Sequence, residues 1–94
     1  MKFHLSEILA VVTCRAIPKP NGDSTLGQDL MEYMLGRWMP WPTKQAREEC
    51  LTELFRQHPR LRGLENAEFE DIHVFLERMI GWFGEELEIQ PTKK

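Results

Sequence analysis

A chain of 94 residues is long enough for one hydrophobic core and too short for a second, so we expect a single compact domain over residues 1–94. Its 12 basic and 15 acidic residues give a net charge of −3, which excludes both a strongly basic nucleic-acid-binding domain and a strongly acidic DNA mimic. The longest early apolar run, from Ile8 to Val12, is too short to cross a bilayer and no secretory signal is evident, so we expect an intracellular protein with no membrane partner.

The chain begins with a segment, Lys2 to Leu5, that can form a short edge strand. Ser6 is a good N-cap for a first helix that ends near Cys14. Cys14 and Cys50 are far apart and form no CxxC pair, which is typical of reduced, buried thiols.

Prolines and turn residues make the segment from Ala16 to Ser24 a predicted loop. Thr25 followed by Gln28 fits a capping box and starts a second helix, which Gly36 ends. Two further prolines exclude regular helix between Arg37 and Pro42, so this segment is the second predicted loop.

A third helix is expected from Thr43 to Gln57, followed by a loop from Arg60 to Glu65. A fourth helix, capped by Asn66 and ended by Gly84, has the clearest amphipathic pattern. Its apolar positions are Phe69, Ile72, Leu76, Met79 and Phe83. The tail from Glu86 to Gln90 alternates and can pair as a strand with the first segment. The predicted fold is therefore mainly α (α+β), with about four helices and short N- and C-terminal strands that pair.

The residues that carry chemistry in enzymes form no recognisable constellation. The histidines, His4, His58 and His73, lack metal-ligand spacing with one another or with a cysteine, so we expect no metal. The two cysteines lie in apolar helical patterns, the carboxylates are typical of solvated helix faces, and the six glycines form no phosphate loop. We expect no catalytic residues, no cofactor and no enzymatic activity.

A binding surface is indicated by the segment from Arg37 to Trp41. Arginine, tryptophan and methionine are enriched at the centres of interfaces, and the prolines reduce the entropy lost on binding. We predict that Arg37, Trp38, Met39 and Trp41 contact a partner, with Glu70 and Asp71 of the fourth helix at the rim. The alternative is that Trp38 and Trp41 fold back as a lid on the core.

Four stretches carry a resemblance to known proteins. They are "KFHLSEILAVVTCRAI", "LMEYMLGRWM", "AREECLTELFRQHPRL" and "GWFGEELEIQP". In this order they resemble a group of small phage and prophage proteins, which share a KF-L-(D/E)IL start, a VTTGR-like segment and an EC…L…QHP.L helix. This chain departs from the group at Cys14, where the group tends to have glycine, and in the first loop. The group has no established catalytic residues, so none is carried over.

The resemblance implies a mobile-element protein acting in the host bacterial cytoplasm, as a monomer or homodimer. Small phage proteins without active sites commonly occupy a surface of a host protein. The leading hypothesis is therefore a non-enzymatic binding protein that inhibits a host defence complex by surface occlusion, as anti-CRISPR proteins do.

Two alternatives stay open. The first is a small DNA-binding or regulatory phage protein, in which the second and third helices approximate a helix-turn-helix. The cations available for phosphates are Lys44, Arg47, Arg56, Arg60 and Arg62. The acidic total charge and the proline-rich connection disfavour a nucleic-acid partner. The second alternative is a structural or assembly protein of a phage particle.

Overall fold

Short helices and two small antiparallel sheets make up the part of the chain that the computed structural model describes, residues 1–38, 43–65 and 67–92. The elements in chain order are β1 (Lys2–His4), α1 (Leu5–Thr13), β2 (Ile17–Pro18), β3 (Ser24–Thr25), α2 (Gln28–Leu35), α3 (Lys44–Gln57), the 3₁₀ helix η1 (Pro59–Leu64), α4 (Ile72–Phe83) and β4 (Glu86–Glu88). This composition confirms the predicted mainly α (α+β) class. None of the described helices combines the length and apolar character that a bilayer crossing needs.

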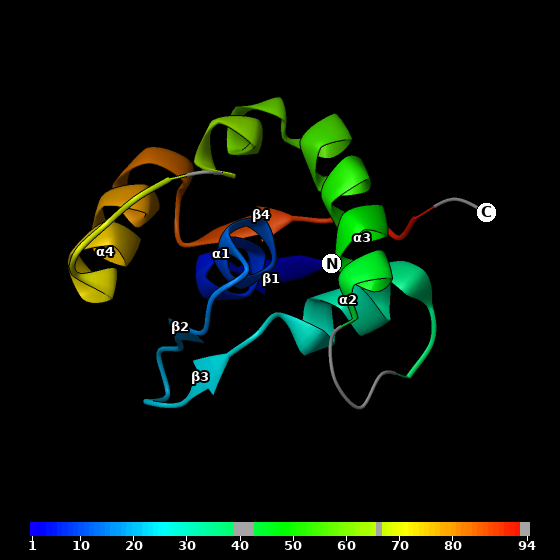
Figure 1. The fold of residues 1–94 in the computed structure, drawn as a ribbon, viewed down its shortest axis with the longest axis horizontal. Helices are drawn as coiled ribbons and strands as arrows, with labels where there is room; N and C mark the ends of the chain where they lie inside the picture. Colours follow the sequence, from blue (N-terminus) through cyan, green and yellow to red (C-terminus); the bar gives the residue numbers. More distant parts are fainter. Residues whose placement is uncertain (39–42, 66, 93–94) are drawn as a thin grey trace.

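Helix α1 is the centre of the core. Its first eight residues are all buried, including the polar Ser6 and Glu7, because α1 is covered by α2, α3, α4 and η1. Figure 1 shows α1 in the middle of the molecule, with α4 at one end and α2 and α3 at the other. A helix that is apolar on nearly every side is stable only in such a position. The other fully buried side chains include Ile17, Leu30, Met34, Leu54, Leu61 and Ile89.

The two ends of the described chain meet in the β1–β4 sheet, as the alternation of the tail predicts. The strands are antiparallel, with Phe3 opposite Leu87. On the other side of β4, the Nε2 atom of His58 donates a hydrogen bond to the carbonyl oxygen of Glu88 over 2.8 Å. The C-terminal end of α3 is thereby tied to the sheet, and the pairing of the terminal strands is confirmed.

The starts of two helices differ from the prediction. Helix α1 begins at Leu5, and its cap is the Nδ1 atom of His4, which accepts from the Ser6 amide over 3.1 Å. Ser6, the predicted cap, is buried inside the helix. Helix α4 begins at Ile72 with Asp71 as its cap, several residues later than predicted. The predicted cap, Asn66, lies outside the described residues.

The segment from Ala16 to Ser24 is not an irregular loop, as predicted, because it includes β2 and the start of the paired strand β3. Ile17 pairs with Thr25 and is fully buried, so it anchors the hairpin to the core. At the turn, the Lys19 amide donates to the Asp23 carbonyl over 2.6 Å. A single large apolar residue amid prolines and turn residues was enough to fix this segment against α1.

The expectation that Cys14 is buried is wrong: its side chain is exposed, and its backbone has a φ of 57° at the end of α1. This left-handed conformation costs a residue with a Cβ about 1–2 kcal/mol and costs glycine almost nothing. Glycine is the residue that the resembling phage proteins tend to have at this position.

We therefore expect Cys14→Gly to stabilise the protein. The relief of backbone strain exceeds the extra chain entropy that glycine adds to the unfolded state, leaving a net gain of about 0.5–1 kcal/mol. Thermal unfolding followed by circular dichroism should show a melting temperature about 2–6 °C higher. Cys14→Ala, which removes the thiol and keeps the Cβ, is the control and should show no such rise. An equal rise in both variants would mean that the thiol, and not the backbone, is the source of the strain.

Candidate binding surface

Trp38 projects from the protein just after α2. Gly36 ends that helix in the left-handed conformation, with a φ of 68°, and its amide donates to the Glu32 carbonyl over 2.9 Å. The chain therefore leaves the helix abruptly, and Arg37 Nη2 lies 3.6 Å from Glu49 Oε2 on α3. The Trp38 side chain follows with 78% of its surface exposed. A glycine stop and one exposed ion pair thus place an indole ring in solvent.

This exposure decides between the two interpretations of Trp38. A tryptophan that covered the core would be mostly buried, so the lid alternative is excluded for this residue. Met39 and Trp41, the other apolar members of the predicted surface, lie outside the described residues. An exposed indole offers a partner about 150–250 Å² of mostly apolar surface, which is the property of a binding anchor.

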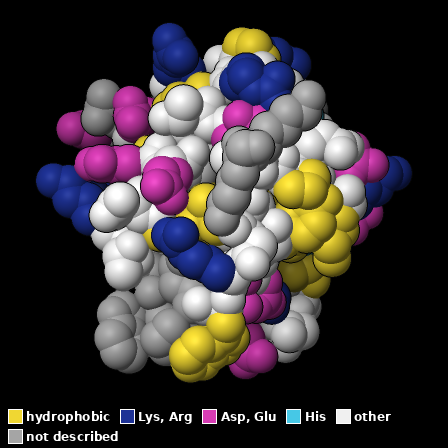
Figure 2. Space-filling model, turned by 90° about the vertical axis from the view of Figure 1, so that its right-hand side faces the viewer, with side chains coloured by type: hydrophobic (Ala, Val, Ile, Leu, Met, Phe, Trp, Pro, Cys, Tyr) yellow, Lys and Arg dark blue, Asp and Glu magenta, His cyan; other side chains and the backbone are white. Residues whose placement is uncertain are grey.

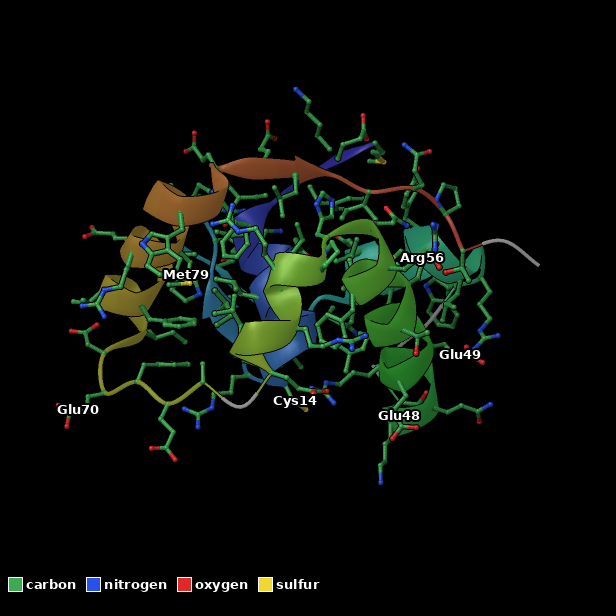
Figure 3. The ribbon with its side chains drawn as sticks, turned by 90° about the horizontal axis from the view of Figure 1, so that it is seen from above. Cys14, Glu48, Glu49, Arg56, Glu70 and Met79 are labelled. Carbon is green, nitrogen blue, oxygen red and sulfur yellow. The ribbon has the colours of Figure 1, made fainter. Side chains whose placement is uncertain are left out.

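Glu70 and Asp71 do not lie beside Trp38. Figure 3 shows Glu70 at one end of the molecule and Glu49, the ion-pair partner of Arg37, near the other. The body of the protein, with α1 at its centre, separates them. Asp71 is also partly committed to structure, since its carboxylate accepts from the His73 amide over 2.9 Å. The predicted single patch is therefore two separate surfaces.

Glu70 and Asp71 instead border a hollow of about 450 Å³ beside α4, which we call the acidic groove. Its lining consists of Glu68, Phe69, Glu70, Asp71, Val74, Phe75, Arg78 and Met79. The rings of Phe69 and Phe75 are stacked, with centroids 4.2 Å apart and planes 12° from parallel. The groove thus combines an aromatic floor with carboxylates at its edge.

The sequence interpretation missed a second exposed indole, Trp82 in the last turn of α4, with 65% of its side chain exposed. It borders a smaller hollow of about 210 Å³ together with His58, Arg60 and Phe83. Its spacing of three from Met79 places Trp82 near the apolar face of the helix, so the periodicity gave no signal that it would be exposed.

The two thiols differ in environment. Burial, reinforced by the nearby charge of Glu49, raises the pKa of Cys50 to about 12, so this thiol stays protonated and unreactive at neutral pH. Cys14 is exposed at the end of α1. Within residues 1–38, 43–65 and 67–92, no three His, Cys, Asp or Glu side chains come together in a way that could hold a metal ion. What these residues form is a set of surfaces for contact.

Four of the five cations that a DNA-binding function would use contact the protein itself. Arg47 donates to the carbonyls of Val11 and Val12, Arg56 donates to Glu53, Arg60 lies over the ring of Phe83, and Arg62 lies over the ring of Phe55. A guanidinium that is already hydrogen-bonded or stacked must give up that contact to bind a phosphate. This arrangement does not favour a nucleic-acid partner.

Figure 2 shows the side of the molecule that carries α2 and α3 in Figure 1. Hydrophobic side chains gather there in separate patches, with acidic and basic side chains between them. Comparison of the chain with protein-family models, with curated proteins and with solved structures finds no match. Function is therefore argued from these surfaces.

Proposed function

We propose that this is a phage-encoded, non-enzymatic binding protein that blocks a host protein by occupying its surface, in the host bacterial cytoplasm. The proposed target is a subunit of a host defence complex, such as a CRISPR surveillance complex. The observation that carries the proposal is the 78% exposure of Trp38. The resemblance of the chain to small phage proteins supports the setting and the class of target.

The surroundings of Trp38 fit an anchor for a partner protein. Tryptophan and arginine are the residue types most enriched among the contacts that dominate binding energy, and Arg37 precedes Trp38 directly. The ion pair between Arg37 and Glu49 is itself exposed, so it can rearrange at little cost when a partner approaches. The core around α1 contains no contribution from Trp38, so the ring is free to bind without loss of stability.

Trp38→Ala is accordingly expected to abolish binding without weakening the fold. The melting temperature should stay within the range of an ordinary surface substitution, about 0.5 kcal/mol in stability. In an affinity pull-down from bacterial lysate with mass spectrometry, the wild-type protein should retain one host protein in stoichiometric amount, and Trp38→Ala should lose it.

Trp82→Ala is the matched control, because it removes an equally large exposed ring from α4. This variant should retain the host protein. If both tryptophan variants bind as well as wild type, the proposed surface is wrong. If Trp38→Ala instead lowers the melting temperature strongly, the ring belongs to the packing of the native state and not to a binding surface.

A further inference from the structure

The acidic groove exists because α4 starts late. Asp71 caps the helix with its carboxylate, which accepts from the amides of His73 and Val74 over 2.9 and 3.3 Å. The residues just before the cap are therefore not helical, and Phe69 stacks on Phe75 from outside the helix. Beside this aromatic pair, Val74 is 51% exposed on the first turn. The floor of the groove is thus apolar surface that no segment of the described chain covers.

The charges around this floor are mainly negative. Glu68, Glu70 and Asp71 line the groove, against Arg78 as the single cation of the lining. Both Glu68 and Glu70 are exposed, and neither has an ion pair within the described part of the chain. An apolar floor with unpaired carboxylates at its edge repels phosphates and acidic segments, and it attracts segments that carry cations.

A contact inside the protein shows which cation the floor accepts. The guanidinium carbon of Arg15 lies 4.8 Å from the centroid of the Phe69 ring, which is the geometry of a cation–π interaction. Arginine is suited to such a site because its planar group stacks on an aromatic ring while its donors reach a carboxylate. The ring pair of the groove therefore already binds one guanidinium, contributed by the end of α1.

We propose that the acidic groove binds a basic, arginine-containing segment of the target protein, with an apolar neighbour of the arginine on the floor of Phe69, Phe75 and Val74. This inference rests on the proposed function and extends it, since it names the chemistry of the partner at a second contact. Because the groove and Trp38 lie at opposite ends of the molecule, the protein reaches its target at two separated places.

A titration with a short peptide of alternating arginine and leucine residues, followed in the backbone-amide NMR spectrum of the full chain, tests the groove directly. We expect saturable shifts of amides between residues 68 and 79. Glu68→Lys combined with Glu70→Lys should weaken the binding about tenfold or more, since two attractive rim charges become repulsive. Glu48→Lys combined with Glu86→Lys changes the net charge equally at exposed positions outside the groove, and should leave binding within about twofold of wild type.

A peptide in which glutamate replaces arginine is the ligand control and should not shift these amides. Equal binding of both peptides, or shifts that fall outside the groove, would overturn the inference. The test is independent of the proposed function, because Trp38→Ala should bind the peptide as wild type does. If wild type retains its host protein through Trp38 but the peptide does not bind, the groove inference alone fails. If the peptide binds and no host protein is retained, the proposed function alone fails.

Discussion

Gly27→Ala is expected to lower the free energy of unfolding by about 2–4 kcal/mol, one of the largest effects of any single substitution in this chain. Gly27 precedes α2 with a φ of 83°, where a residue with a Cβ is strained. The new methyl group would also overlap the Cγ2 atom of Val11 and lie 3.1 Å from the carbonyl oxygen of Glu7. Both groups belong to the buried centre of α1, which cannot move aside without loss of packing.

Gly36→Ala separates the two causes. Gly36 has a similar φ of 68°, but a Cβ added there meets nothing within 4 Å. It should cost only the backbone strain, about 1 kcal/mol. Chemical denaturation of both variants measures the difference. Equal losses would show that α2 does not approach α1 at Gly27 as closely as the structure has it.

Arg47→Ala is the second large effect, an expected loss of about 2–4 kcal/mol, because charged hydrogen bonds to half-buried groups are worth more than neutral ones. From α3, Arg47 donates through Nε to the carbonyl of Val11 over 2.8 Å and through Nη2 to that of Val12 over 3.0 Å. These are carbonyls at the end of α1, which have no partner within their own helix. Their loss would leave buried residues of α1 with unpaired oxygens.

Arg47→Lys should recover only part of this loss, since lysine lacks the planar fork that reaches both carbonyls. Arg56→Ala removes another arginine of α3, one whose side chain is exposed and paired with Glu53 one turn away. It should change the melting temperature very little. If Arg47→Ala is as mild as Arg56→Ala, then the end of α1 is not held by α3.

Much of the fold could be predicted from local sequence signals. The alternation of the tail predicted the strand that pairs with residues near the start, because alternation places one face of a strand on the core. Thr43 predicted the start of α3, and its hydroxyl does accept from the Ala46 amide over 3.1 Å. Gly36 and Gly84 predicted the ends of their helices, since both take positive φ values.

Other features depend on tertiary contacts and could not be read locally. Asn66 and Asp71 are both good caps, and Asp71 caps α4 in a structure where Phe69 stacks on Phe75 outside the helix. The β2–β3 hairpin forms where turn residues alone predicted a loop, because Ile17 is buried in the core. Cys14 adopts a conformation suited to glycine, and the residue type gave no local signal for it.

The candidate surface was predictable in composition but not in layout. Residue types pointed to Trp38, and its side chain is exposed as an anchor must be. The distance between Trp38 and Glu70 is set by α1, which lies between the two ends of the molecule, and no spacing along the chain contains that information. The same reason explains why Trp82 was missed: its exposure depends on where α4 passes the edge of the core.

Surface occlusion differs from enzymatic action in its stoichiometry, and this difference tests the proposed function most directly. The host protein retained through Trp38 would be purified, and its own activity measured while increasing amounts of this protein are added. We expect activity to fall in proportion to the amount added, to vanish at a fixed molar ratio, and to return when the complex is dissociated. Complete inactivation by a small fraction of an equivalent, persisting after removal of the protein, would contradict occlusion and would identify an enzyme.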